Sequence, residues 1–176
     1  LGNGTREHSA WPVMVMQGSG SSLVPLTGVV SIASVGYHTL ALRADGSVWG
    51  WGANGFRELG REGTEFQPYA LQVPGLPAIK EIAVGWHHSV ALDVNGRLWI
   101  WGSNPAYQFA EETRKHFDGP ILLKGLPKMT AIACGSWHSL ALDEARHVWA
   151  WGKNHYGMLG TGDTISRSLP VRVPSL

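Results

Sequence analysis

The sequence has little charge, a single cysteine and no long apolar run, and each shortage narrows what the chain can be. Charged residues make up 15% of the 176 residues, and 14 lysines and arginines against 13 acids give a net charge of +1. With so little net positive charge, the sequence does not predict the basic surface that is typical of nucleic-acid-binding proteins. No run of about 18 or more apolar residues is present, so the sequence predicts no membrane-spanning helix.

The lone cysteine, Cys134, cannot form a disulfide within the chain. Cysteine usage therefore does not decide between a reducing and an oxidising compartment. No charged-then-apolar leader follows Leu1, but earlier removal of a signal peptide is an open alternative. The sequence makes no prediction about localisation.

Motifs of catalysis are missing as well. The sequence contains no phosphate-binding Walker loop, no His-Glu-x-x-His pair for zinc and no Gly-x-Ser-x-Gly elbow for a nucleophilic serine. No pair of carboxylates is predicted on one strand face beside a candidate nucleophile. We therefore expect a binding protein that needs no cofactor and is not an enzyme.

What the sequence does have is glycine and tryptophan, with 23 of the first and nine of the second. Glycine punctuates turns, whereas the large aromatic side chain of tryptophan favours strands. Many short strands separated by glycine turns are the expected outcome.

An internal repeat of 50 residues organises these features. His38, His88 and His138 each precede a short apolar run, and a Trp-x-Trp-Gly motif begins at Trp49, Trp99 and Trp149. Alternation of bulky residues within each run predicts strands with one buried face. A period of about 50 residues with several strands per unit is typical of propeller blades, in which each small sheet is covered by its neighbour.

The expected fold is all-β, an arc of about three to four four-stranded propeller blades. We divide this single domain into the trailing half of a preceding repeat with a Gly/Ser-rich insertion of eight residues (1–28) and three repeats (29–76, 77–126 and 127–176).

The turn between the apolar run that follows the histidine and the Trp-x-Trp strand differs among units. Asp45-Gly46 and Asn95-Gly96 are pairs that populate two-residue type I′ turns. The third unit has Ala145-Arg146 instead, so we expect either a different, longer turn or a strained residue there.

Three segments of the third unit, Ile132 to Leu142, Val148 to Asn154 and Tyr156 to Asp163, resemble the regulator of chromosome condensation repeat. The resemblance covers nearly the whole chain. It implies a seven-bladed propeller with a protein-binding face, in a family that includes a nucleotide-exchange factor for a small GTPase, ubiquitin-ligase domains and a bacterial β-lactamase inhibitor. The wedge and basic tail of the exchange factor have no visible counterpart in this sequence.

Departures from the repeat nominate the partner-binding residues. The second unit replaces the glycine-rich loop with a segment that mixes aromatic and basic residues, a composition favoured at protein interfaces. The first unit has an arginine at a glycine position. Three tryptophans, Trp11, Trp86 and Trp137, lie outside the Trp-x-Trp pattern, and the last two are expected near a strand entry. The resulting candidate contacts are Tyr107, Phe109, Arg114, His116, Phe117, Arg57, Trp86 and Trp137.

The recurring histidines and tryptophans are interpreted as structural. One histidine per blade is too widely spaced to share a metal ion, so we expect His38, His88 and His138 to be hydrogen-bonded in the core and predict no metal site. The Trp-x-Trp side chains are expected to pack between blades, although an aromatic sugar platform is the alternative.

The predicted function is therefore a protein-interaction module, with a GTPase exchange factor and a structural segment of a larger assembly as alternatives. Leu1 to Gly4 match the phase of Leu159 to Gly162, so we expect the chain to expose apolar blade faces at both ends. The remainder of a longer propeller chain, or self-association, would cover them. A capped, well-behaved monomer of 19.1 kDa would contradict this expectation.

Overall fold

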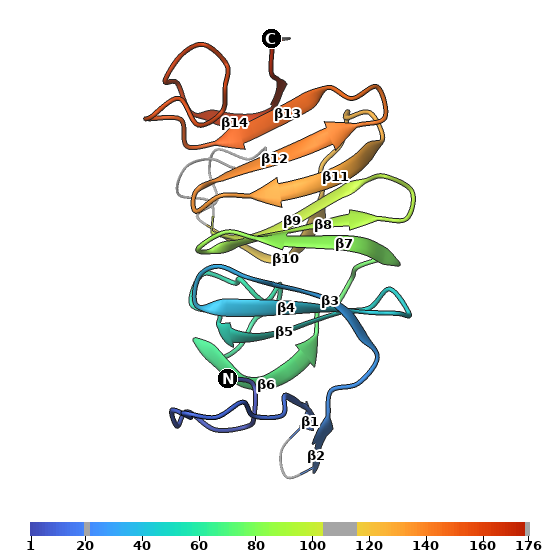
Figure 1. Ribbon diagram of the computed structural model, residues 1–176, viewed down its shortest axis with the longest axis vertical. Coiled ribbons are helices and arrows are strands. Elements are labelled where there is room, and N and C mark those ends of the chain that lie inside the picture. Colours follow the sequence, from blue (N-terminus) through green and yellow to red (C-terminus); the bar gives the residue numbers. More distant parts are fainter. Residues whose placement is uncertain (20–21, 104–115, 175–176) are drawn as a thin grey trace.

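The computed structural model describes residues 1–19, 22–103 and 116–174 and contains one six-stranded and two four-stranded sheets (Figure 1). Each sheet contains a four-stranded antiparallel unit, and we call these units blades 1 to 3. Blade 1 consists of β3 (Val29–Ser34), β4 (His38–Arg43), β5 (Val48–Ala53) and β6 (Phe66–Gln72). Blade 2 consists of β7 (Ile79–Val84), β8 (His88–Asp93), β9 (Leu98–Ser103) and β10 (His116–Leu122). Blade 3 consists of β11 (Met129–Cys134), β12 (His138–Asp143), β13 (Val148–Gly152) and β14 (Arg167–Arg172).

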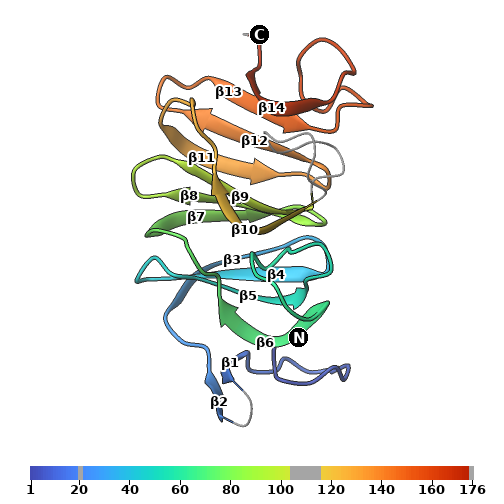
Figure 2. The same cartoon turned by 180° about the vertical axis from the view of Figure 1, so that it is seen from behind.

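The three blades are meanders that stack side by side, as the views from both sides show (Figures 1 and 2). This arrangement confirms the predicted all-β propeller arc. Within the described ranges no helix is present, and hence none that is long and apolar enough to cross a membrane.

Equivalent strands keep the same register in every blade. His38 pairs with Gly52, His88 with Gly102 and His138 with Gly152. Each of these glycines has a φ near +100°, where the pairing of the third strand with the fourth shifts register. A side chain is disfavoured at such a φ, which explains why every Trp-x-Trp pair is followed by glycine.

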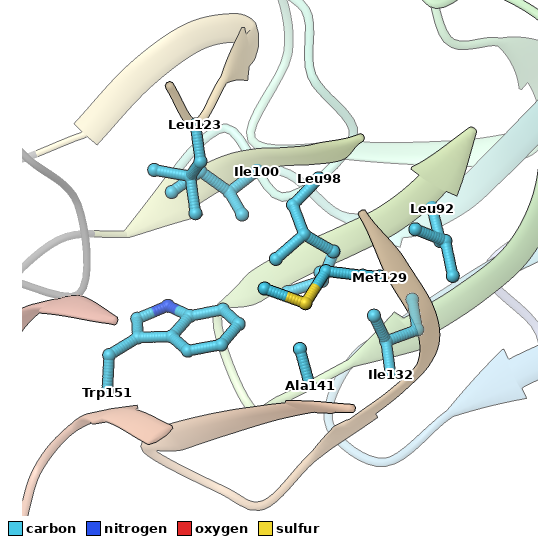
Figure 3. Close-up of a cluster of buried hydrophobic side chains, with 9 residues drawn as sticks. Leu92, Leu98, Ile100, Leu123, Met129, Ile132, Ala141 and Trp151 are labelled. Atoms are coloured by element: carbon cyan, nitrogen blue, oxygen red, sulfur yellow. The ribbon is translucent and has the colours of Figure 1, made fainter. Parts of the chain in front are cut away.

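The second tryptophan of each pair lies in a strand and is buried. Trp51, Trp101 and Trp151 lie in β5, β9 and β13 and are 9%, 0% and 0% exposed. Trp151 packs with Met129 and Ile132 of blade 3 against apolar side chains of blade 2 (Figure 3). The prediction that equal phase means similar burial in strands is confirmed, as is packing between blades for Trp101 and Trp151, whereas Trp51 packs against the first 28 residues.

The recurring histidines also join the blades. His38 Nε2 lies 2.9 Å from Ser89 Oγ of blade 2, and His88 Nε2 lies 3.0 Å from Ser139 Oγ of blade 3. Ser89 donates its hydroxyl proton to Glu58 O, so His38 Nε2 carries a proton and donates to Ser89. His38 and His88 are each 1% exposed, and the interpretation of these two as hydrogen-bonded core residues is confirmed.

Burial in the core disfavours the protonated imidazole. Loss of hydration, and then the neighbouring imidazoles, lower the pKa of His38 to about 3 and that of His88 to about 4. Burial also lowers the pKa of His138 at the edge of blade 3. These histidines are therefore neutral in the folded chain at pH 7.

The hairpin turns differ from the two-residue type I′ turns predicted above. In blade 1, Arg43 N donates to Ser47 O at 2.9 Å, which leaves three residues in the loop, and only Gly46 has a positive φ. Such a loop is a type I turn followed by a left-handed residue. The prediction was wrong because an Asx-Gly pair is compatible with both turns. Glycine takes the left-handed position in the two-residue type I′ turn and in this three-residue loop.

Blade 3 builds the same turn without glycine. Arg146 occupies the equivalent position with a φ of 65°, as the backbone bonds of Asp143 and His147 require. The expectation of a strained residue is thus confirmed, and the alternative of a longer turn is not. The strain is local because the turn geometry matches that of the other blades.

Replacing Arg146 with glycine is expected to stabilise the fold by roughly 0.5–1 kcal/mol, since a left-handed conformation costs a non-glycine residue about 1–2 kcal/mol. The Arg146 side chain is exposed and forms no ion pair within the described residues. Gly96→Ala is the matched opposite, because its φ is +80° and a Cβ there would lie 3.0 Å from Met129 O. Urea unfolding should show stabilisation in the first variant and destabilisation in the second; equal stabilities would contradict the strain.

The first 28 residues pack along blade 1. Gly2 lies against the Trp51 indole, as Gly60 lies against that of Trp101, and Val15 joins the same apolar cluster. The predicted insertion forms a hairpin of β1 (Met16–Ser19) and β2 (Ser22–Pro25), which extends the blade 1 sheet through a parallel bridge from β1 to β6.

Both outer blades expose apolar side chains whose equivalents are buried. Ile32 of blade 1 is 71% exposed, whereas Ile82 and Ile132 are 7% and 9% exposed. Val148 of blade 3 is 40% exposed, whereas Val48 is 1% exposed. The expected uncovered faces are therefore present, and what covers them stays a prediction to be tested by the solution mass.

Candidate functional site

Loops from all three blades gather at one edge of the arc. In an antiparallel meander the turn from the first strand to the second and the connection from the third to the fourth lie at the same end. The β3–β4, β7–β8 and β11–β12 turns therefore lie at the same edge as the β5–β6 and β13–β14 connections (Figure 1).

Five ring side chains meet at this edge, and we call them the aromatic face: Tyr37, Phe56, Trp86, His87 and Trp137. His87 is central, with ring centroids 4.7 Å from Phe56, 5.5 Å from Trp137 and 6.4 Å from Tyr37. Trp86 meets Trp137 edge-on at 5.6 Å. The rings come from three blades, so the surface is continuous across the blade boundaries.

These rings are unusually accessible for their size. Tyr37 is 77% exposed, Phe56 48% and Trp86 45%. Between Tyr37 and Trp86 lies a hollow of about 230 Å³, which Val35 and Gly36 also line. A Cβ on Gly36 would lie 2.5 Å from Trp86 O, so glycine is needed for the two loops to approach this closely.

A buried carboxylate holds the centre of the cluster. Glu58 is 1% exposed; its Oε1 lies 3.0 Å from His87 Nδ1, and its Oε2 accepts a 2.9 Å hydrogen bond from Phe56 N. Glu58 O additionally accepts hydrogen bonds from Ser89 Oγ and Trp101 Nε1. Glu58 therefore fixes both rings to the rigid core of blade 2.

Charged residues frame the rings. Arg57 has a φ of 65° and donates from Nε to Asp118 Oδ1 at 3.0 Å, which ties the blade 1 loop to β10. Lys153 Nζ lies 4.3 Å from the centre of the Trp137 ring, a favourable cation–π distance. The face thus presents aromatic area together with both signs of charge.

The loop scaffold itself is repeated. Asn54 accepts from Leu59 N at 3.1 Å and donates to Arg61 O, and Asn154 accepts from Leu159 N at 2.9 Å and donates to Asp163 O. These buried asparagines shape the β5–β6 and β13–β14 connections. Their recurrence marks them as structural.

The aromatic face does not follow the repeat. The residue before the recurring histidine is Tyr37 in blade 1, His87 in blade 2 and Trp137 in blade 3. Glu58 is replaced by Met158 at the same phase in blade 3. Positions that differ while the scaffold is constant are those that packing does not dictate, which is where a repeat protein carries its specificity.

The structure brings together three of the eight predicted contact residues, Arg57, Trp86 and Trp137, on or beside the aromatic face. Tyr107, Phe109 and Arg114 lie outside the described residues. His116 and Phe117, expected in a loop, begin β10, where their backbones pair with Ser103 and Gly102. The loop assignment of these two residues was wrong, because β10 begins at His116; their contact with a partner stays a prediction.

Four residues of the site were missed: Tyr37, Phe56, Glu58 and His87. The signal was available, since the position before each recurring histidine carries a different large ring. The Glu58–His87 contact was not predictable because the two residues are 29 apart and meet only when blades 1 and 2 pack.

Comparison with known families follows the same repeat. Two family models, both described as the regulator of chromosome condensation (RCC1) repeat, match the chain. One matches residues 29–58, 79–108 and 129–157, and the other matches residues 45–92, 95–142 and 147–176.

Solved structures resemble the chain at low sequence identity. Prp20p from Saccharomyces cerevisiae, described with its binding properties to Gsp1p and histones, is 25% identical with a TM-score of 0.78, over 87% of this chain and 40% of that one. Yeast RCC1 (Prp20) bound to Kap60 is 25% identical with a TM-score of 0.79, over 87% of this chain and 39% of that one. Human WBSCR16 is 24% identical with a TM-score of 0.76, over 88% of this chain and 43% of that one. The chain spans about two fifths of the length of these proteins.

Proposed function

The chain belongs to the regulator of chromosome condensation (RCC1) repeat family, and from this premise we propose that it is a protein-interaction module that grips a protein partner with the aromatic face. The observation that carries the proposal is the cluster of exposed rings at positions where the repeats differ. Tryptophan, tyrosine and arginine are the residues most enriched at binding hot spots.

The geometry supports binding by a rigid surface. Glu58 and the Asn54 and Asn154 side chains fix the loops before any partner arrives, so little conformational entropy is lost on association. Tyr107, Phe109, Arg114, His116 and Phe117 stay proposed contacts, because a mixture of aromatic and basic residues is favoured at protein interfaces. The yeast relatives bind proteins, among them Kap60.

A variant carrying both Tyr37→Ala and Trp86→Ala is expected to lose partner affinity by about 30-fold or more, which corresponds to about 2 kcal/mol for removal of hot-spot rings. Wild-type protein captures the partner from an extract, mass spectrometry identifies it, and isothermal titration calorimetry then measures both affinities with purified components. Both side chains are exposed, so folding is retained.

Val94→Ser is the matched control, because Val94 is 58% exposed in the β8–β9 turn at the opposite edge. Wild-type affinity in the double variant, or an equal loss in the control, would contradict the proposal. If the partner is a small GTPase, nucleotide release in the same samples decides whether the chain is an exchange factor.

A further inference from the structure

The edge opposite the aromatic face carries a second feature, built by the β8–β9 turn and the β10–β11 connection (Figures 1 and 2). A hollow of about 250 Å³ lies between these segments. Its apolar lining includes Leu122, Leu126 and Pro127, and three cationic residues, Arg97, Lys124 and Lys128, also line it. A small apolar hollow with several cations around it is suited to a ligand that is both apolar and anionic.

Arg97 is held in position by a buried carboxylate. Asp93 is fully buried; its Oδ2 accepts from Arg97 Nε at 2.7 Å and from Trp99 Nε1 at 3.2 Å. Its Oδ1 accepts from the backbone N of Asn95 and of Arg97. Because the anchor uses only Nε, the two terminal nitrogens of the half-exposed Arg97 side chain are left for a bidentate acceptor.

The two lysines add charge that the fold does not use. Lys124 and Lys128 are exposed, and within residues 1–19, 22–103 and 116–174 neither forms an ion pair or a side-chain hydrogen bond. The acid nearest in the backbone network is the exposed Glu144, whose N donates to Lys128 O. Asp93 and Glu144 supply two carboxylates against two lysines and an arginine, so a net positive charge stays at the hollow.

None of these cations is needed to build a blade. At the same phases as Arg97, Lys124 and Lys128, the first repeat has Ser47, Pro74 and Ala78, and the blade 1 turn forms with the same backbone hydrogen bonds. The positive charge is therefore specific to the edge of blade 2, as the rings are specific to the aromatic face.

We propose that this hollow binds a peptide segment in which a carboxylate lies next to an apolar side chain. The carboxylate pairs with the terminal nitrogens of Arg97 and with the lysine ammonium groups, while the apolar side chain enters between Leu122, Leu126 and Pro127. Binding of this kind weakens with salt, because the lysines are exposed to screening. The site is independent of the aromatic face.

The test is an NMR titration of ¹⁵N-labelled chain with the blocked peptide acetyl-Asp-Leu-Glu-Leu-Asp-amide at low salt. We expect saturable shifts confined to residues 96–98 and 122–128. Lys124→Gln with Lys128→Gln should weaken binding by about tenfold or more, whereas Lys80→Gln, which removes an exposed lysine from β7, should leave it unchanged. Raising the salt should weaken the wild type more than the double variant.

Three further probes separate the alternatives. The neutral peptide with Asn and Gln in place of the acids should bind at least about tenfold more weakly, and so should the acidic peptide with Ser in place of Leu. Inorganic phosphate should not match the acidic peptide. Equal binding of the neutral peptide, equal binding of phosphate, or shifts elsewhere on the chain would each overturn the proposal.

Discussion

Acidification from pH 7 to pH 4 is expected to destabilise the fold by about 6 kcal/mol through two histidines alone. The ordinary pKa of histidine is 6.5, and burial lowers it to about 3 for His38 and about 4 for His88. Below pH 6.5 both imidazoles are protonated in the unfolded chain, whereas in the folded chain they stay neutral until the pH approaches their lowered pKa values. Stability from these side chains is therefore complete above pH 6.5 and is lost as the pH falls toward 4.

The size of the effect follows from linkage. Each pH unit below 6.5 costs about 1.4 kcal/mol per histidine until the folded pKa is reached, so each contributes about 3 kcal/mol by pH 4. Typical domains are stable by about 5–15 kcal/mol, and a loss of this size approaches unfolding. The pKa of Asp93, Asp143 and Asp163 is lowered from 3.8, so these carboxylates act only at lower pH.

Urea unfolding followed by tryptophan fluorescence at several pH values between 7 and 4 measures this loss. His88→Gln should be less stable at pH 7 but show a flatter pH profile, because one of the two coupled protonations is removed. His155→Gln, at an exposed position, is the control and should keep the wild-type slope. A stability that does not change between pH 6.5 and 4 would contradict the buried neutral histidines.

Trp101→Ala should destabilise the chain by about 3–5 kcal/mol, the usual cost of removing a buried aromatic side chain. Trp101 is fully buried between blades 1 and 2, and its Nε1 donates to Glu58 O at 2.7 Å. Removing the indole leaves a cavity, and Glu58 O keeps only its hydrogen bond from Ser89 Oγ. Glu58 also fixes the aromatic face, so the loss reaches the site.

Trp86→Ala is the matched control, because Trp86 is 45% exposed and its loss opens no cavity in the core. We expect a cost of less than about 1 kcal/mol for that change. Chemical unfolding of both variants compares the two tryptophans directly. Similar losses would show that the blade interfaces do not depend on the indoles at the repeated phase.

Features that repeat were predictable from the sequence, and the physical reason is that packing imposes them on every blade. His38, Gly52 and Trp101 each have equivalents that make similar contacts in the other blades. Recurrence of these residue types therefore predicted the strands, their burial and the order of the blades. The turn type was not predictable, because Asp45-Gly46 suits two turns and only strand pairing fixes the loop length.

The candidate site was predicted only in part because it is made of the residues that do not repeat. Trp86 and Trp137 stood out as tryptophans outside the pattern, whereas Glu58 and His87 look ordinary until blades 1 and 2 pack and join them. The cationic hollow beside Arg97 was not predicted for the same reason. Lys124 and Lys128 form a common site with Arg97 only when the β10–β11 connection packs beside the β8–β9 turn.

Amide hydrogen exchange of the chain with and without its captured partner tests most directly whether the aromatic face grips that partner. We predict slower exchange in the β3–β4, β7–β8 and β11–β12 turns, around Tyr37, His87 and Trp137, and no change in the β4–β5 turn at the opposite edge. Protection confined to that opposite edge, with the turns of the aromatic face unchanged, would contradict the account.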